Sequence, residues 1–279
     1  MAIQERNAEL IDMLRSDFQP RNEMAFSWAE ACSMYLQLPG LRGFWPMSAV
    51  DSSGNAQDQS GHSHILTYTG NSVYGLDLTT ARCLAAYIRF DGTGDYLTRA
   101  DEADFDITGT ETYFTSQATS AGAARGMTCG GWFRPEDVTN DQGLVTKWGA
   151  AGNYSWLLGL YGSVAGDPLR LYISDDGTNT DSVSSAAACA VNTWQFMAGR
   201  FNDGDAGAEL AVFLNGTGTT AATARASIFS GNGPFNISGN NNGTALYTGR
   251  AALCFQCAAA LPNVTLWALY QQTRTLFGV

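Results

Sequence analysis

The first groups in this sequence that could do chemistry are acidic side chains in stretches rich in Ser, Gly and Asn, such as "DSSGNAQDQSG" (51–61) and "DGTGD" (91–95). Their oxygens are the hard ligands that Ca²⁺ takes. The same residue types are common in turns, because their side chains accept hydrogen bonds from nearby backbone N–H groups. No stretch has the spacing of an EF-hand loop, so we expect turns, no cofactor and no metal. The six candidate calcium ligands are Asp51, Asp58, Asp91, Asp95, Asp101 and Asp104.

A second acidic group could serve hydrolysis. Glu102, Asp104 and Asp106 alternate along "ADEADFDITGTE" (100–111). On a strand, alternate residues share one face, where two carboxylates can act as acid and base. The preceding "RADEA" (99–103) suits a turn or a short helix better than a strand, so the sequence predicts no enzyme.

Histidine and cysteine pairs are the remaining candidates for metal ligands. His62 and His64 flank one serine, but neither an acidic residue nor a cysteine lies at a matching spacing, so we expect exposed loop histidines. Cys254 and Cys257 have no second pair, and we expect them to belong to a strand. The other four cysteines are isolated, mostly among apolar residues, which favours reduced, buried thiols: Cys32, Cys83, Cys129 and Cys189.

Aromatic residues could act by stacking on a sugar ring. The stretch "KWGAAGNYSW" (147–156) carries Trp148, Tyr154 and Trp156 close together. If they are exposed, these three residues predict a stacking platform for a glycan.

The elements that must position these groups fall into two parts. Apolar residues recur at helical spacing up to Pro39-Gly40, which predicts two helices in a terminal arm over residues 1–40. These helices either pack against their own domain or dock on a partner or sister subunit. The candidate contact residues of the arm are Ile3, Leu10, Ile11, Leu14, Phe18, Met24 and Trp28.

Residues 41–279 have the period of β-strands. Apolar residues alternate in "LRLYIS" (169–174) and "ELAVFLNG" (209–216), and "YIRFDGTGDYL" (87–97) predicts two strands joined as a hairpin. Glycine-rich turns recur between such strands, with no alternating helices. The pattern predicts an all-β antiparallel sandwich.

Several motifs, taken in order, add a family resemblance. Trp45 precedes the turn "DSSGNAQDQSG", and "YIRFDGTGDYL", "MTCGGWFRPED", "NTWQFMAGRFNDG" and "LAVFLNGTGT" follow. Together they resemble the laminin-G-like, concanavalin A-like jelly-roll domain over about residues 41–279. The matching positions are Trp45, Asp51, Gly54, Asn55, Phe90, Asp91, Gly92, Trp132, Pro135, Trp194, Gly204, Asn215 and Gly216.

The resemblance implies a role for several residues. Trp45 is expected to anchor the first core strand, and residues 51–61 to form the turn that reverses the chain. Hydrolases of this fold carry a Glu-x-Asp-x-x-Glu pattern, but Ile107 stands at its last position, which argues against hydrolysis. The segment with Leu261, Trp267, Leu269 and Tyr270 resembles the family's last strand followed by a short helix.

Charge and hydropathy narrow the possible partners. Fifteen Lys and Arg against 26 Asp and Glu give a net charge of −11, which repels nucleic acid and anionic membranes. The N-terminus does not resemble a secretion signal, and no apolar stretch is long enough to predict a membrane span. We therefore expect synthesis in a cytoplasm.

Two functions remain open. The helical arm and acidic jelly roll resemble laminin-G-like proteins of tailed bacteriophages, which predicts a non-enzymatic virion protein, a capsid decoration or fibre subunit. Its expected partners are the major capsid protein, other virion proteins and copies of itself, with a trimer favoured. The alternative is a carbohydrate-binding module of a bacterial surface protein, and the two roles are compatible if a virion protein binds host glycans.

Overall fold

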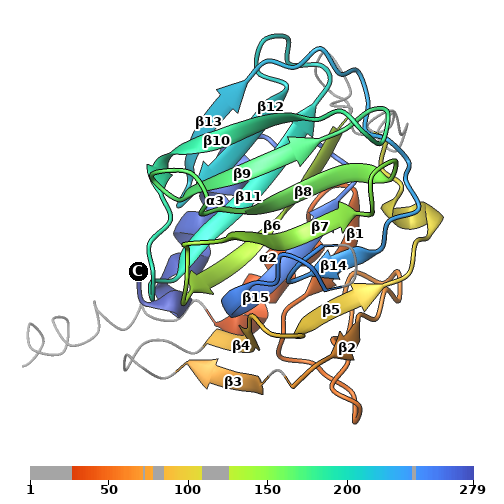
Figure 1. Ribbon diagram of the computed structural model, residues 1–279. Helices are drawn as coiled ribbons and strands as arrows, with labels where there is room; N and C mark the ends of the chain where they lie inside the picture. Colours follow the sequence, from red (N-terminus) through yellow and green to blue (C-terminus); the bar gives the residue numbers. More distant parts are fainter. Residues whose placement is uncertain (1–26, 72, 78–84, 109–125, 241–242) are drawn as a thin grey trace, which may run out of the picture.

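The protein folds as a sandwich of two antiparallel sheets, as Figure 1 shows. The computed structural model describes residues 27–71, 73–77, 85–108, 126–240 and 243–279. The predicted all-β antiparallel sandwich is confirmed. The arm residues Ile3, Leu10, Ile11, Leu14, Phe18 and Met24 lie outside the described residues.

The first sheet, here called the covered sheet, has eight strands centred on β15. β15 pairs with β6 along one edge and with both β4 and β1 along the other. Its strands in spatial order are β13 (Thr217–Ala221), β12 (Leu210–Leu214), β11 (Gln195–Asn202), β6 (Gly126–Pro135), β15 (Thr248–Cys257), β4 (Ala85–Asp91) and β3 (Val73–Asp77), with β1 (Leu41–Trp45) off this path.

The second sheet, here called the open sheet, has seven strands and forms the front layer in Figure 1. Every pairing in it is antiparallel. In spatial order the strands are β10 (Asp181–Ala188), β9 (Pro168–Ile173), β8 (Tyr154–Tyr161), β7 (Asp141–Trp148), β14 (Phe235–Ile237), β5 (Tyr96–Arg99) and β2 (Thr67–Thr69).

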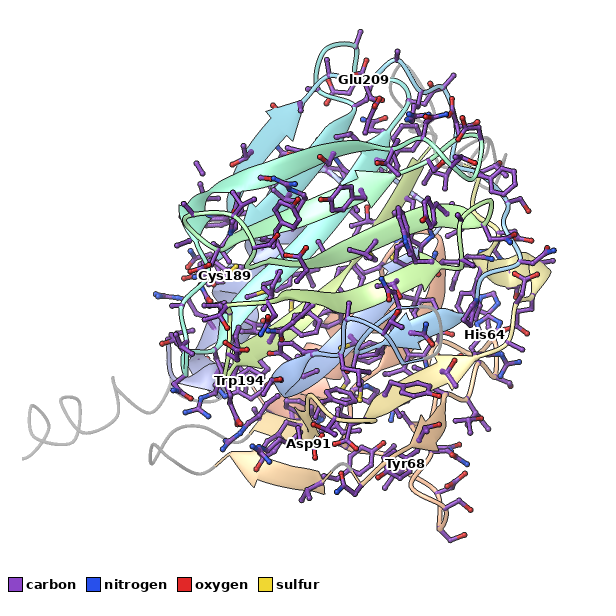
Figure 2. The ribbon with its side chains drawn as sticks, viewed as in Figure 1. His64, Tyr68, Asp91, Cys189, Trp194 and Glu209 are labelled. Atoms are coloured by element: carbon purple, nitrogen blue, oxygen red, sulfur yellow. The ribbon has the colours of Figure 1, made fainter. Side chains whose placement is uncertain are left out.

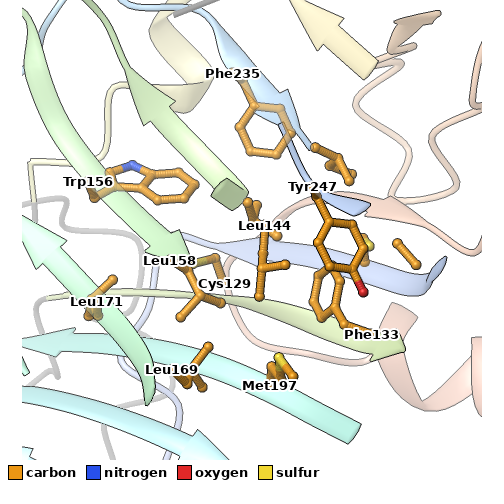
Figure 3. Close-up of a cluster of buried hydrophobic side chains, with 14 of the residues drawn as sticks. Cys129, Phe133, Leu144, Trp156, Leu158, Leu169, Leu171, Met197, Phe235 and Tyr247 are labelled. Carbon is orange, nitrogen blue, oxygen red and sulfur yellow. The ribbon is translucent and has the colours of Figure 1, made fainter. Parts of the chain in front are cut away.

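The main hydrophobic core lies between the two sheets, and Figure 3 shows part of it. Leu169, Leu171 and Ile173 point into it from β9, as their alternation predicts. Trp45 is fully buried there, and its indole Nε1 donates a hydrogen bond to the carbonyl of His64 at 2.7 Å. The prediction of Trp45 as a core anchor is confirmed.

A second apolar cluster lies on the outer face of the covered sheet, beneath the helices α2 (Trp28–Leu36) and α3 (Asn263–Thr273) and the short helix η2 (Arg274–Phe277). Tyr35 of α2 stacks on Phe44 of β1, with ring centroids 5.0 Å apart. Phe277 stacks on Trp132 at 4.2 Å. The short helix expected after the last strand is present. No helix among the described residues is long and apolar enough to cross a membrane.

The N-terminal helix α2 packs on its own domain. It begins with a capping box in which Ser27 and Glu30 each bond the other's backbone N–H. Ala31 and Tyr35 are fully buried. Trp28 packs near Phe277 and donates a hydrogen bond to Ser48 at 3.0 Å. Trp28 is thus used inside the domain, and its contact with a partner stays a prediction.

The predicted hairpin at residues 87–97 is wrong. β4 belongs to the covered sheet and β5 to the open sheet, so the turn between them crosses the sandwich. The buried Asp95 carboxylate holds this crossing by accepting hydrogen bonds from the backbone N–H of Asp91 and of Asn71. Apolar residues of both strands face the same core. A hairpin within one sheet would give the same alternation as a turn that crosses between the sheets, so alternation alone does not distinguish the two.

The Asp51–Gly61 stretch forms turns, as predicted. Asp51 accepts hydrogen bonds from the backbone N–H of Ser53 and Asn55, at 2.8 and 3.0 Å. Asp58 accepts from the backbone N–H of Phe44, Ser60 and His64. These two carboxylates therefore fix the backbone of the turns, and the absence of a calcium site stays a prediction.

Candidate functional site

The outer face of the open sheet differs from that of the covered sheet. No helix among the described residues lies over it, and Figure 1 shows β7, β8 and β9 as an open front surface. Side chains here face away from the core, yet four of them are large aromatic rings, all half-buried: Trp148, Tyr154, Tyr161 and Tyr172. A sheet face exposed to water does not need such rings for folding, so this face is the candidate site.

The four rings form a continuous row across three strands. Trp148 of β7 and Tyr154 of β8 stack almost in parallel, with centroids 4.4 Å apart and planes 9° apart. Tyr172 of β9 lies 6.2 Å from Trp148, and Tyr161 lies 6.1 Å from Tyr172. We call these four residues together with Arg170 the aromatic platform.

Arg170 is held between two of the rings. Its guanidinium carbon lies 3.6 Å from the Tyr161 ring centroid and 5.5 Å from that of Tyr172. Its Nη1 donates to the Tyr172 hydroxyl at 2.9 Å, and its Nε donates to Ser184 at 2.6 Å. Burial raises the pKa of Tyr172, so this hydroxyl stays protonated at neutral pH. The platform thus presents a fixed cation and hydroxyl groups beside apolar rings.

A hollow of about 120 Å³ lies beside Tyr161, Arg170 and Tyr172. Gly143 of β7 pairs with Gly159 of β8, and Gly159 pairs with Arg170. A Cβ added at Gly159 would lie 2.4 Å from the Gln142 carbonyl oxygen, so this position requires glycine. The residues around the hollow include Asp141 and Asn240. Oδ1 of Asp141 accepts from the backbone N–H of Ser163, and Oδ1 of Asn240 accepts from the Thr244 hydroxyl.

The structure separates the three aromatic residues that the sequence grouped. Trp148 and Tyr154 lie together on the platform, but Trp156 is fully buried in the core, 6.0 Å from the Phe235 ring. The prediction of Trp156 as a stacking residue is wrong. Figure 3 shows it facing the interior with Phe235.

The reason is a β-bulge in β8. Lys147 pairs with Trp156, whereas the next residue, Trp148, pairs with Tyr154, so Ser155 is the extra residue. One extra residue reverses which face the following side chains occupy. Tyr154 therefore points outward and Trp156 inward, although they are two residues apart.

Sequence reasoning missed Tyr161, Arg170 and Tyr172. A usable signal existed for two of them, because in "LRLYIS" the apolar residues alternate with Arg170 and Tyr172. If Leu169, Leu171 and Ile173 face the core, Arg170 and Tyr172 must face outward. Their closeness to Trp148 depends on strand order, which the sequence did not give.

The acidic residues considered for hydrolysis do not lie on a strand. They lie around the short helix η1 (Ala103–Phe105), in agreement with the expected turn or short helix. Each is paired with a cation: Glu102 with Arg99, Asp104 with Arg42 and Asp106 with Lys147. The absence of enzymatic activity stays a prediction.

The histidines are placed differently from the expectation of exposed loop residues. His62 is exposed, but His64 is buried, with 3% of its surface accessible. Both imidazoles face Asp104, which the sequence spacing did not suggest because it follows His62 by 42 residues. Cys254 and Cys257 lie in β15, as expected, and both are fully buried.

These features define an all-β sandwich with one face covered by helices and one aromatic face open. The family model described as the concanavalin A-like lectin/glucanases superfamily, a laminin G model, matches residues 108–252. This match covers just over half of the chain. The chain therefore belongs to that superfamily, as the motif resemblance implied.

Solved structures of low sequence identity share the fold. Domain 4 of AbnA, an extracellular arabinanase from Geobacillus stearothermophilus, solved in complex with arabinotriose, is 16% identical with a TM-score of 0.56, covering 83% of this chain and 98% of that domain. The binding domain of Paraclostridial Mosquitocidal Protein 1 is 15% identical, with a TM-score of 0.56 and coverage of 83% and 52%.

The binding domain of botulinum neurotoxin serotype G is 9% identical, with a TM-score of 0.57 and coverage of 83% and 50%. The chain thus spans about half the length of these toxin domains. No curated protein sequence matches the chain.

Proposed function

We propose that this domain binds a neutral carbohydrate chain on the aromatic platform of the open sheet. The observation that carries the proposal is the row of four half-buried aromatic rings on a sheet face that no described helix covers. Rings of this kind offer a large apolar contact area at a low entropic cost, because few rotatable bonds must be fixed.

The chemistry of the platform suits a sugar. The apolar C–H face of a pyranose or furanose ring can stack on Trp148 or Tyr172. Arg170, the tyrosine hydroxyls and the side chains of Asp141 and Asn240 can bond its hydroxyl groups. The net charge of −11 disfavours a polyanionic glycan, so a neutral chain is the expected ligand.

A fold relative supports the same ligand class. The AbnA domain, 98% of which this chain covers, was solved in complex with arabinotriose, a neutral trisaccharide. At 16% identity this similarity concerns the fold alone. Binding by this chain is therefore inferred from its own aromatic residues.

A glycan array followed by calorimetric titration of the strongest ligand tests the proposal. Trp148→Ala and Tyr172→Ala should each weaken binding at least about tenfold, because each removes one stacking ring from the row. Trp267→Ala is the matched control, since Trp267 is 53% exposed but lies on α3, over the covered sheet. Equal affinity of the wild type and all three variants for the glycan would contradict the proposal.

A second candidate function is attachment to a larger assembly, and exposed apolar side chains on α2 and α3 favour it. Leu36 of α2 and Val264 and Trp267 of α3 are 45%, 70% and 53% exposed. Beside them, α2 and α3 flank a groove of about 410 Å³, lined by Met34, Gln37, Leu38, Pro39, Val264, Thr265, Ala268 and Leu269. Apolar surface of this kind is common where proteins meet.

The predicted virion role, as a capsid decoration or fibre subunit, would use the groove and these exposed side chains together with the N-terminal segment. The comparisons add no support for a phage origin, so this role rests on the sequence argument. Light scattering of the full chain, a variant lacking residues 1–26 and Trp267→Ala would test it. The truncation should spare α2, because removing Tyr35 would uncover Phe44. If all three proteins are monomers, assembly through this surface is contradicted.

A further inference from the structure

We propose that His62, His64 and Asp104 form a zinc site at one edge of the sandwich, separate from the aromatic platform. The Oδ2 atom of Asp104 lies 3.3 Å from Nδ1 of His62 and 3.3 Å from Nε2 of His64. All three ligand atoms lie within 4.8 Å of one another. Figure 2 shows His64 at the edge of the molecule near β5 and η1.

His64 is built into the structure as a metal ligand would be. Its backbone N–H donates to Asp58, its carbonyl accepts from Trp45, and its ring packs on Phe105 with centroids 4.6 Å apart. Its Nδ1 lies 2.7 Å from the carbonyl of Arg42 and must donate to it. Such a bond to the second ring nitrogen fixes the orientation and tautomer of metal-binding histidines.

The other ring nitrogen of His64, Nε2, faces carboxylate groups. Only 4% of the His64 side chain is accessible, and its Nε2 faces two carboxylate oxygens, those of Asp104 at 3.3 Å and Glu102 at 3.4 Å. With Nδ1 the donor to the Arg42 carbonyl, Nε2 is the ring atom that is left to bind a metal ion. A zinc ion placed beside Nε2 would also be attracted by these carboxylate oxygens.

The distances and donor types favour zinc. Bonds of about 2.0–2.2 Å to imidazole nitrogen and carboxylate oxygen place neighbouring ligands of a tetrahedral ion roughly 3.3 Å apart. Two of the three ligand pairs already have this separation. His62 is about one third exposed and can rotate to close the third pair. Calcium and magnesium prefer oxygen ligands alone, so they do not fit two imidazoles.

The neighbouring charges leave Asp104 available. Arg42 Nη1 lies 3.3 Å from Oδ1 of Asp104, so it orients the carboxylate while Oδ2 faces the histidines. Arg99 pairs with both oxygens of Glu102, and Glu102 Oε1 also lies 3.4 Å from Nε2 of His64, so Glu102 lies beside the site as a further acidic group. Water would supply the fourth ligand of a tetrahedral ion. The zinc ion would tie the segment before β2 to η1, close to the Trp45 end of the core.

Calorimetric titration of tag-free, chelator-stripped protein with zinc chloride tests the site. These are the only two histidines in the chain, so a tag must be absent but no other histidine can compete. We expect one zinc ion per chain and a weakening of at least about tenfold in His62→Ala and in Asp104→Asn. Cobalt(II) should give the visible absorption bands of a tetrahedral site. Zinc at about a hundredfold above its Kd should raise the Tm of the wild type by about 5 °C.

Asp205→Asn is the matched control. Like Asp104 it is close to half exposed and lies beside an arginine, Arg200, at 3.6 Å. It should bind zinc like the wild type. Unchanged Tm values without metal would show that the variants fold. The proposal is overturned if the wild type binds no zinc, which would make the cluster a hydrogen-bonded clasp only, or if His62→Ala binds zinc as tightly as the wild type.

Discussion

Truncation of Tyr154 and of Trp156 should affect different properties of the protein, although the two residues are only two positions apart on one strand. The bulge at Ser155 turns Tyr154 toward solvent and Trp156 into the core. Trp156 has no accessible surface, and it packs against Phe235 among the residues of the main core. Replacement of a fully buried tryptophan by alanine removes its burial and leaves a cavity.

The expected magnitudes differ severalfold. Trp156→Ala should lower the free energy of unfolding by about 3 to 5 kcal/mol. Because a chain of this size loses about 2 to 4 °C per kcal/mol, its Tm should fall by about 10 °C. Tyr154→Ala loses mainly its stacking on Trp148, which is worth about 1 kcal/mol. Tyr154→Ala should instead weaken glycan binding.

Urea unfolding and thermal melting of both variants, each beside the wild type, measure the difference. The bulge argument is refuted if the two variants lose equal stability, or if Tyr154→Ala is the less stable one. Trp156→Phe serves as a control for the aromatic character of the site. It keeps a buried ring while removing an indole N–H that no described residue accepts, so it should cost clearly less than Trp156→Ala.

Two further predictions concern buried or half-buried charges. Lys147 is 1% exposed and pairs with Asp101 and Asp106, so Lys147→Met should cost about 3 to 5 kcal/mol in urea unfolding; a stability equal to the wild type would show that the pairs contribute nothing. Burial acts to raise the pKa of Glu136, but its bonds to Arg89 lower it overall from 4.5. The ionised Glu136 carboxylate thus stabilises the fold above pH 4.5, and this stabilisation is lost as the pH falls through the lowered pKa. Glu136→Gln should therefore reduce the free energy of unfolding at pH 7 by about 1 kcal/mol and make the fall of Tm toward acid pH less steep. The same dependence of Tm on pH in the variant and the wild type, measured from pH 7 to 3, would contradict this.

Local chemistry made much of the fold predictable. Trp45 and Asp51 were assigned correctly, because a large apolar residue before a run of turn formers specifies a strand followed by a reversal. The alternation around Leu171 identified a half-buried strand. The short helix at the C-terminus followed from the family motif, which carries packing information that a period alone does not.

Other features depend on how distant segments meet. The turn at Asp91–Asp95 has the glycines of a hairpin, but whether it stays in one sheet or crosses the sandwich depends on which strands pair with β4 and β5. Trp156 was misplaced because a one-residue bulge leaves no mark in a short sequence pattern. Asp104 joins the histidines only through folding, since local spacing cannot reveal a ligand 42 residues away.

A crystal structure of the protein soaked with its strongest array glycan tests the central claim most directly. The account predicts a sugar ring stacked over Trp148 or Tyr172 on the outer face of β7, β8 and β9, with a hydroxyl group bonded to Arg170. A glycan bound over the helices of the covered sheet or at the edge with His64 would contradict it, as would a complete lack of binding in the array.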